Sequence, residues 1–407
     1  MEAESTQIIR LEGSPTEIGA AFGSVNAEDI QREIDGYLRR DHSRDNLLKS
    51  TEEYRRIVGR IAPDWVEEAS ALAGAAAVDP EIYLAYQGAK YRGINTPDCF
   101  TYFSPPRRSE SGMTIFHKNR DNRDRPQCAY VKETRTSNRD LFRFAATGDT
   151  SDIGTMMGLN EKGLAAAADT GSSDPSPRFV GMMNPDLMRL VLEQAATVAE
   201  AWELLEDIHN QRIYAGAKVA TNWMFADAAG QCIRVEQYSE SLARTHDQSE
   251  FLTMRDDDRG QFVMASLRGS VSPLSPSFLN RISRSEPVLA KTNISAMTAI
   301  IPGSHVDLFG CAQFAVYKTD RTVYVPLFLG ALGTPRDLLD GTFYRNSKDL
   351  ASDWSPDEIE DKLDIQRKLI ESSARSALQT SGTEAARKIL TEGCARMAAA
   401  ALNALRD

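Results

Sequence analysis

The feature that most constrains the fold is a change of sequence pattern near residue 93. Before it, apolar residues such as Ile30, Ile34 and Leu38 recur with the helical period. Residues 93–98 (GINTPD) are rich in turn formers, and short segments typical of strands begin after them. Runs of helices and strands in this order are typical of a layered α+β fold.

Local signals place the individual elements. Ser14 followed by Pro15 and Glu17 predicts a helix start, and Asp79–Pro80 predicts another helix over 81–89. Further helices are predicted over 186–194, 197–208 and 356–406, and a long surface loop over 256–277. The predicted strands are 99–103, 113–117, 130–134, 141–146, 153–157, 222–226, 232–237 and 322–328. We expect a helical leader, residues 1–98, followed by a catalytic domain, residues 99–407.

Composition excludes several classes of protein. The 407 residues carry a formal net charge of -11, so the chain lacks the basic surface that nucleic acid requires. No apolar run reaches the roughly 18 residues of a membrane span, and residues 1–10 lack a secretory signal pattern. We expect a soluble, cytoplasmic protein without a membrane or nucleic-acid partner.

The cysteines do not form a metal-binding or disulfide pattern. Five cysteines and five histidines are scattered along the chain, without a CxxC pair. We therefore expect no metal and no cofactor. The acidic run Asp256 to Asp258 lacks the glycine and terminal glutamate of a calcium loop, which favours a solvated loop there.

Cys99 is the strongest candidate for a reactive residue. The chain contains no G-x-S-x-G, H-E-x-x-H, P-loop or G-x-G-x-x-G motif. Cys99 lies where the leader meets the first predicted strand, directly after Asp98. If the peptide bond between them were cut, Cys99 would carry both a thiol and an α-amine. An α-amine ordinarily has a pKa of about 7.7–8.0, so it could act as the general base for the thiol of the same residue.

Several segments resemble a known family. They are residues 11–23 (LEGSPTEIGAAFG), 98–101 (DCFT), 116–122 (FHKNRDN), 158–164 (GLNEKGL), 222–230 (NWMFADAAG) with Val235 and Glu236, and 277–281 (SFLNR). In this order they resemble the acyl-coenzyme A:6-aminopenicillanic acid acyltransferase group of self-processing N-terminal-nucleophile hydrolases, a family similar to peptidase family C45.

The resemblance implies a four-layer αββα sandwich and amide-bond chemistry after self-cleavage between Asp98 and Cys99. By position it implies that Cys99 is the nucleophile and that Asn119 and Asp121 orient its amine or the substrate. It also implies an oxyanion donor at the backbone N–H of Asn160. Asn222 is a further candidate catalytic residue, and the candidate contacts to substrate are Phe100, Thr101, Lys118 and Arg281. The implied partners are a small-molecule amide or acyl-CoA and, after cleavage, the other half of the chain in a heterodimer.

Each candidate also has a purely structural interpretation. Asp121 is alternatively a residue that caps a turn and has no catalytic role. Residues 158–164 are alternatively a hairpin turn needed for the fold alone, and Asn222 is alternatively a structural polar residue. Arg281 is typical of a helix surface residue paired with a carboxylate. His117 is typical of a satisfied structural histidine, and the four cysteines other than Cys99 of packing residues.

Two positions depart from the family pattern. Met254 stands where the family usually has an asparagine that serves the oxyanion, and Thr221–Asn222 is an alternative source of that donor. Lys118 stands where relatives often have arginine, which points to a different substrate. Three functions remain open: an acyltransferase, an amide hydrolase without transfer, and an unprocessed binding protein.

Overall fold

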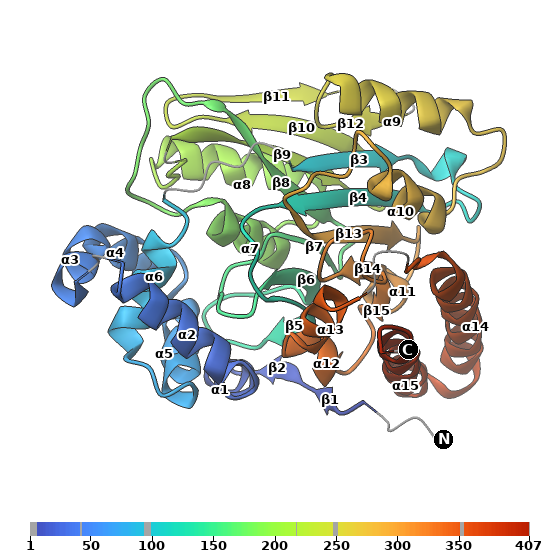
Figure 1. The fold of residues 1–407 in the computed structure, drawn as a ribbon, viewed down its shortest axis with the longest axis horizontal. Coiled ribbons are helices and arrows are strands. Elements are labelled where there is room, and N and C mark those ends of the chain that lie inside the picture. The colour runs from blue at the N-terminus through green and yellow to red at the C-terminus, as the bar shows by residue number, and fades with distance from the viewer. Residues whose placement is uncertain are drawn as a thin grey trace.

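The computed structural model describes residues 6–40, 43–92, 99–216, 218–246, 251–350 and 354–406 (Figure 1). Within these residues the strands form an eight-stranded sheet, a six-stranded sheet and a two-stranded pair, β1 (Ile8–Ile9) with β16 (Thr334–Pro335). The mixed helix-and-sheet class predicted from the sequence is confirmed.

Helices dominate the leader. They are α1 (Pro15–Val25), α2 (Ala27–Leu38), α3 (Arg44–Ser50), α4 (Glu52–Ile61), α5 (Pro63–Ala75) and α6 (Pro80–Ala89). The predicted start of α1 is confirmed: the Ser14 hydroxyl accepts from the N–H of Glu17, and the Glu17 carboxylate accepts from the N–H of Ser14. This capping box satisfies N–H groups that a helix start otherwise leaves unpaired.

The eight-stranded sheet has the order β11-β10-β9-β8-β7-β6-β5-β2. Its strands are β2 (Leu11–Gly13), β5 (Gln127–Thr134), β6 (Phe144–Asp149), β7 (Met157–Asn160), β8 (Ala165–Ser173), β9 (Val219–Ala226), β10 (Cys232–Gln237) and β11 (Leu242–His246). Helices α7 (Asn184–Gln194) and α8 (Val198–Asn210) connect β8 to β9. The edge strand β2 belongs to the leader and runs parallel to β5.

The six-stranded sheet has the order β12-β3-β4-β13-β14-β15. Its strands are β3 (Phe100–Ser104), β4 (Thr114–Asp121), β12 (Leu252–Thr253), β13 (Asn293–Ile301), β14 (Cys311–Ala315) and β15 (Val325–Phe328). The other elements are the short 3-10 helix Pro106–Arg108 and helices α9 (Asp258–Gly269), α10 (Pro276–Arg284), α11 (Val306–Phe309), α12 (Arg336–Leu339), α13 (Thr342–Lys348), α14 (Asp357–Ser381) and α15 (Thr383–Ala404).

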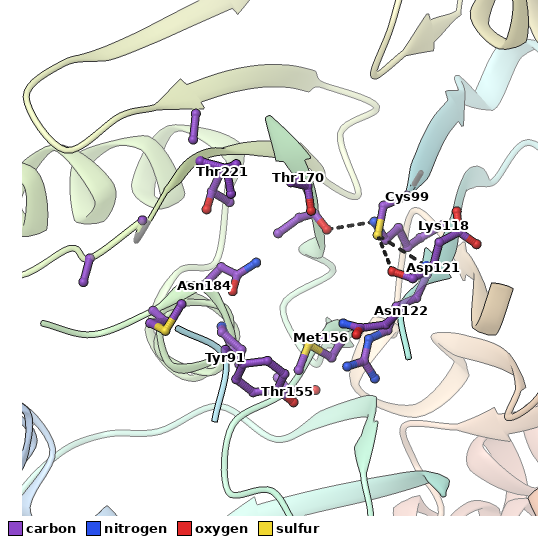
Figure 2. A pocket seen from close by; sticks show the side chains of 18 residues that line it. Tyr91, Cys99, Lys118, Asp121, Asn122, Thr155, Met156, Thr170, Asn184 and Thr221 are labelled. Atoms are coloured by element: carbon purple, nitrogen blue, oxygen red, sulfur yellow. Dashed lines mark hydrogen bonds between the residues drawn. The ribbon is translucent and has the colours of Figure 1, made fainter. Parts of the chain in front are cut away.

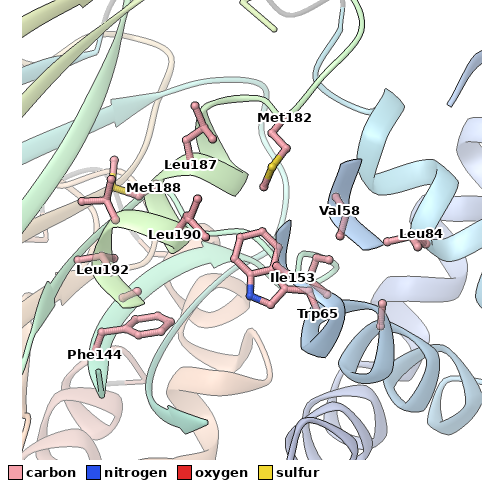
Figure 3. Packing of buried hydrophobic residues seen from close by; sticks show 14 of the residues in the cluster. Val58, Trp65, Leu84, Phe144, Ile153, Met182, Leu187, Met188, Leu190 and Leu192 are labelled. Atoms are coloured by element: carbon pink, nitrogen blue, oxygen red, sulfur yellow. The ribbon is translucent and has the colours of Figure 1, made fainter. Parts of the chain in front are cut away.

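Three large apolar clusters hold these elements together. One cluster joins the leader helices and α7 and α8 to one face of the eight-stranded sheet; in Figure 3, Trp65 of α5 lies beside Ile153 and Leu190. A second fills the space between the two sheets and extends to α14 and α15. A third packs α9 and α10 against Phe100 and Tyr102 of β3. Each large apolar side chain buried in this way stabilises the fold by about 1.5–3 kcal/mol.

The prediction of a surface loop over 256–277 is wrong. Most of this stretch is α9, in which Val263 and Leu267 are buried four residues apart. The Asp257 carboxylate accepts from the N–H of Gly260 and caps the helix start, so this acidic run serves a helix. The charged and small residues at 257–260 concealed the helical period that follows.

Other boundaries also shifted. The predicted strand 153–157 is wrong, because β7 begins only at Met157 and Gly154 lies against Pro185 in a tight approach. The strand predicted over 141–146 begins at Phe144, and β8, β13 and β14 were missed. The alanine-rich sequence of β8 carries little strand propensity, so this segment becomes a strand through pairing with its neighbours β7 and β9. No helix among the described residues is long and apolar enough to cross a membrane.

Candidate active site

Cys99 directly precedes β3, which pairs antiparallel with β4. The backbone N–H of Asp121 donates to the Cys99 sulfur at 3.4 Å, and the thiol lies 3.6 Å from the Asp121 carbonyl oxygen. Only 6% of the Cys99 surface is exposed. The pairing of two strand ends therefore fixes the sulfur in position (Figure 2).

A small pocket opens beside this sulfur. It is formed by the ends of β4, β8 and β9, the loop before β7, the start of α7 and the end of the leader. The lining residues are Tyr91, Cys99, Lys118, Arg120, Asp121, Asn122, Thr155, Met156, Ala168, Thr170, Met183, Asn184, Pro185, Ala215, Gly216, Val219, Ala220 and Thr221. The walls combine apolar side chains with a few polar groups, which is typical of a small-molecule site.

A buried ion pair lies next to Cys99. The Lys118 ammonium contacts the Asp169 carboxylate and donates to the Ala168 carbonyl oxygen at 2.7 Å. The Thr101 hydroxyl donates to the same carboxylate at 2.8 Å. These side chains bridge β4 and β3 of one sheet to β8 of the other. Burying two charges this deeply is tolerated only because each ion forms an ion pair with the other.

Burial raises the pKa of the Cys99 thiol. Lys118 acts in the opposite direction and lowers this pKa, whereas Asp169 and Asp121 raise it. The protonated thiol is a weak nucleophile, so Cys99 in the intact chain needs a nearby base to react.

Asp121 also lines the pocket and is buried. The Asn293 side-chain amide donates to its carboxylate at 3.2 Å. The main-chain N–H of the same aspartate reaches the sulfur. The main chain of Asp121 thus contacts the Cys99 sulfur, and its carboxylate lies at the same pocket. A carboxylate at this position is suited to bind a cationic amine, which is the role that the sequence predicts for Asp121.

A second polar network closes the pocket near the leader. The Arg120 guanidinium donates to Asp149 at 2.7 Å, and Arg125 donates to the other oxygen of the same carboxylate at 2.9 Å. The Tyr91 hydroxyl donates to Asp149 at 2.8 Å and also contacts Asp152. Burial alone would raise the pKa of Asp149, but Arg120 and Arg125 outweigh it and hold the pKa well below its usual range. The end of the leader is therefore tied to the site.

The structure turns Asn119 and Phe100 away from the pocket. The Asn119 amide donates to the Ser283 carbonyl oxygen at 3.0 Å, and its oxygen lies 3.1 Å from His117 Nε2. Phe100 packs in the cluster beneath α9 and α10. Both residues face the opposite side of their strands from Lys118, because side chains alternate along a strand. His117 contacts Thr298 at 2.7 Å, so its prediction as a satisfied structural histidine is confirmed.

Asn160 lies at the other end of β7 from Met156, which lines the pocket. Its N–H donates to the Leu164 carbonyl oxygen at 3.0 Å, and its side chain accepts from the N–H of Lys162 and of Leu164. Gly163 completes this turn with a positive φ of 95°. The N–H that was predicted to serve the oxyanion is therefore engaged inside the hairpin turn.

Asn222 and Arg281 are also outside the pocket. Asn222 lines a separate groove with Arg234 and Met254, whereas its neighbour Thr221 lines the pocket itself. Arg281 is 48% exposed and lies 3.9 Å from the Asp361 carboxylate of α14, so the predicted surface pair is confirmed. Asp98, the residue before the predicted cleavage, lies outside the described residues.

Sequence reasoning missed Asp169 and Thr170. They follow the alanine run of β8, which matches no catalytic motif, and the register that sets Asp169 opposite Asn222 is a tertiary fact. The four other cysteines are buried in the apolar clusters, as predicted: Cys128, Cys232, Cys311 and Cys394. Among the described residues no three His, Cys, Asp or Glu side chains gather as a metal site would require.

One family model matches part of this chain. Residues 108–254 match the model of the family described as acyl-coenzyme A:6-aminopenicillanic acid acyl-transferase. The resemblance inferred from the sequence motifs is thereby confirmed over these residues. No curated protein matches the chain.

Solved structures give further similarities. Penicillin V acylase from Agrobacterium tumefaciens is 17% identical, with a TM-score of 0.40 over 53% of this chain and 82% of that one. An N-acylethanolamine-hydrolyzing acid amidase ortholog from Caenorhabditis elegans is 13% identical, with a TM-score of 0.38 over 50% and 93%. A variant of conjugated bile acid hydrolase from Clostridium perfringens is 14% identical, with a TM-score of 0.37 over 54% and 89%.

Proposed function

We propose that this chain is a cysteine amide hydrolase or acyltransferase of the N-terminal-nucleophile type, with an αββα sandwich, that activates itself by cutting the bond between Asp98 and Cys99. The observation that carries the proposal is the position of Cys99. Its sulfur lies at the N-terminal end of β3, lines the pocket and accepts a hydrogen bond from the N–H of Asp121 at 3.4 Å. The family match over residues 108–254 supports acyl-transfer chemistry.

Activation begins with attack of the Cys99 sulfur on the carbonyl carbon of Asp98. The C–N bond breaks as the C–S bond forms, and the nitrogen of Cys99 takes up the thiol proton to become a free α-amine. Water then hydrolyses the thioester, which leaves a carboxylate on Asp98 and a thiol on Cys99. Nucleophile and base now occupy one residue.

The mature enzyme repeats this chemistry on a substrate amide. The α-amine removes the thiol proton, the sulfur attacks the amide carbonyl, and the leaving amine departs with that proton. The resulting thioester is resolved by water, or by an acceptor amine if the enzyme is a transferase. Asp121 stabilises the ammonium that forms when the α-amine takes the thiol proton, and Lys118 stabilises the thiolate, since it already lowers the pKa of Cys99.

The developing oxyanion needs donors other than Asn160, whose N–H is engaged in its turn. Thr170 and Thr221 both line the pocket and carry hydroxyl groups. We assign the oxyanion contact to the Thr170 hydroxyl, because Thr221 already shares a hydrogen bond of 2.9 Å with the Tyr214 hydroxyl.

In this proposal residues 1–98 form one chain and residues 99–407 the other after cleavage. The two would remain a heterodimer. Leader helices share an apolar cluster with the eight-stranded sheet, and β2 pairs with β5 inside that sheet. Tyr91 of the leader also lines the pocket, so its loss would open the site.

Intact-mass measurement under denaturing conditions tests the proposal. We expect two fragments that meet between residues 98 and 99, and a single uncut chain for Cys99→Ala. Cys128→Ala is the matched control, because Cys128 is buried in β5 outside the pocket and should leave processing unchanged. An uncut wild-type chain, or a cut Cys99→Ala chain, would contradict self-cleavage by Cys99.

A second candidate function is a binding protein that is never processed. Met254 favours it, because the residue is buried, its N–H donates to the Thr101 carbonyl oxygen at 2.8 Å, and its side chain offers no oxyanion donor. This alternative predicts an uncut chain whose Cys99 reacts with alkylating reagents no faster than the other buried cysteines.

A further inference from the structure

Strand β13 has an irregular pairing with β4 at the end that lies beside the candidate site. Ser295 lies opposite Arg120, and from there toward Ile301 the two strands pair residue by residue. In the other direction the next pair is Asn293 opposite Asp121, so one extra residue forms a β-bulge. In a regular strand Asn293 would share a face with Ser295. The bulge instead sets Asn293 opposite Asp121, and bulges beside active sites re-aim side chains in this way.

The Asn293 side chain is fully buried and joins three segments of the chain. Its amide nitrogen donates to the Asp121 carboxylate and to the Arg120 carbonyl oxygen, both at 3.2 Å. Its amide oxygen accepts from the N–H of Thr319, in the loop after β14, at 2.9 Å. The acceptors on β4 require the nitrogen and the Thr319 N–H requires the oxygen. These partners therefore hold the Asn293 amide in one orientation, with its N–H groups toward β4.

The two groups of β4 that Asn293 contacts belong to the candidate site. The N–H of Asp121 donates to the Cys99 sulfur at 3.4 Å. This N–H and the Arg120 carbonyl are the two ends of one planar peptide unit, and in a trans peptide they point in opposite directions. Asn293 binds the oxygen end of that unit, and the sulfur binds its hydrogen end. One side chain thus fixes both the peptide unit behind the nucleophile and the carboxylate beside it.

We propose that Asn293 is a positioning residue of the reaction, which holds the peptide unit between Arg120 and Asp121 against the sulfur and orients the Asp121 carboxylate for the ammonium of Cys99. The inference rests on the proposed function, in which Cys99 is the nucleophile. Hydrogen bonds in a chain polarise one another, so a carbonyl that accepts from Asn293 makes its peptide N–H a better donor to a thiolate. A carboxylate that is oriented in advance needs no reorganisation when the ammonium forms.

The hydrogen bond from the peptide unit also acts on the titration of the thiol. Burial raises the pKa of Cys99, Lys118 of β4 lowers it, and Asp169 of β8 and the Asp121 carboxylate raise it. The hydrogen bond from the Asp121 N–H lowers this pKa. Loss of the Asn293 amide should weaken that hydrogen bond while Lys118 and Asp169 stay in place. The pKa of the thiol should then rise.

The rate of self-cleavage in Asn293→Ala and Asn293→Asp tests the proposal without an added substrate. The fraction of cut chain is measured by denaturing intact mass at intervals after a pulse of in-vitro translation. Alanine removes the amide, and aspartate keeps an acceptor for Thr319 but sets a carboxylate against that of Asp121. We expect both variants to be cut about 10–100-fold more slowly than wild type, because a displacement of about 1 Å at a reacting group costs this much.

The pH profile of Cys99 alkylation by iodoacetamide is the readout that a purely structural role would not move. Trypsin releases Cys99 in a peptide that begins at residue 93 in an uncut chain and at residue 99 in a cut one, so peptide mapping follows each state separately. The thiolate is the reactive form, and a higher pKa moves the rise of the rate to higher pH. We expect that shift in both Asn293 variants, compared with wild type in the same state.

Asn280→Asp is the matched control. Asn280 of α10 is also a buried asparagine, it contacts Gln313 at 3.2 Å and Thr298 at 2.6 Å, and it does not line the pocket. This variant adds a buried carboxylate on the other side of the six-stranded sheet. Its stability should fall, whereas the pH profile of Cys99 should stay that of wild type. An equal shift in Asn280→Asp would refute a specific role for Asn293.

A double variant keeps the proposal testable if the single variants fail to fold. Asn293→Asp/Asp121→Asn again sets one carboxylate opposite one amide but exchanges their strands. It should regain stability relative to Asn293→Asp and still be cut slowly, because the carboxylate has left β4. Cleavage of the double variant at the wild-type rate would refute the proposal.

The two readouts separate this inference from the proposed function. A wild-type chain that is never cut rejects the function, and the pH profile of the uncut chain still tests the contact of Asn293 with the peptide unit. Wild-type cleavage in Asn293→Ala with an unmoved pH profile keeps the function and rejects the role of Asn293. Slow cleavage with an unmoved profile also rejects that role, because loss of structure alone would explain it.

Discussion

The two faces of β4 carry different kinds of side chain, although the residues of the two faces alternate along one short sequence. His117 and Asn119 face α10, where each contacts a protein group within 3.1 Å. Lys118 and Arg120 face the eight-stranded sheet and line the pocket. One face holds neutral groups that join a strand to a helix, and the other holds buried ions beside a thiol.

The two faces also differ in charge and in what their contacts contribute to stability. Burial lowers the pKa of His117 to about 3, so the imidazole is neutral and its face carries no charge at physiological pH. On the other face two cationic side chains form ion pairs with carboxylates from the opposite sheet. Neutral hydrogen bonds contribute modestly to stability, whereas a buried ion without its partner is strongly destabilising. A polar run in a strand therefore contains both structural residues and site residues, in alternation.

The largest expected effect comes from Lys118→Met. The change leaves the Asp169 carboxylate buried without its cation, which should cost about 3–5 kcal/mol of unfolding free energy. It also removes the group that lowers the pKa of Cys99, so that pKa should rise further. Denaturant unfolding measures the first effect, and the pH profile of Cys99 alkylation measures the second.

The sign of the pH effect follows from the thiolate being the reactive form. A higher pKa moves the rise of the alkylation rate to higher pH, so the rate at a pH of about 8 should fall in Lys118→Met. The double variant Lys118→Met/Asp169→Leu removes both charges and should regain much of the stability. An unchanged pH profile in the single variant would show that Lys118 does not act on the thiol.

A smaller effect is expected on the other face of the strand. Asn119→Ala removes the donor to the Ser283 carbonyl oxygen and the partner of His117, which should cost about 1–3 kcal/mol of stability. Because the side chain points away from the pocket, Cys99 alkylation should stay within about twofold of wild type. Thermal unfolding and alkylation rates check the two expectations. A large loss of reactivity in a folded Asn119→Ala protein would make this residue part of the site after all.

The smallest effect is expected on α10, the helix that covers the Asn119 face. Arg281→Ala removes a half-exposed side chain 3.9 Å from Asp361, and such surface pairs are worth about 0–1 kcal/mol. Stability should change by less than about 0.5 kcal/mol, and amide turnover should be unaffected. A raised KM for an amide substrate in Arg281→Ala would show that this arginine contacts the substrate after all.

The local sequence predicted several elements correctly for local reasons. The capping box at Ser14 and the cap at Asp79 satisfy backbone groups within a few residues, so they can be recognised without the fold. The two C-terminal helices were predicted as one helical region, and Gly382 divides them with a φ of 87°. The position of Cys99 at the start of a strand was also predicted, because the turn formers before it and the strand residues after it are adjacent in sequence.

The candidate site was predicted only in part. Cys99, Lys118 and Asp121 lie together on the pocket, whereas Asn119, Asn160 and Asn222 do not line it. Asn160 belongs to a turn whose shape is explained without catalysis: its side chain donates to the Leu192 and Ala195 carbonyl oxygens and accepts two N–H groups of the turn. A motif read along the chain cannot separate a turn that builds the fold from a group that meets substrate.

By itself the sequence determined the succession of helices, strands and helices, the caps, and the position of Cys99 directly before a strand. Tertiary structure decided which face of β4 became the site and which residues joined it. Asp169 lies 51 residues from Lys118 and meets it only because the two sheets pack face to face. The physical reason is that the sequence shows only that side chains alternate between the two faces of a strand. Which face becomes the site depends on which sheet or helix packs against each face.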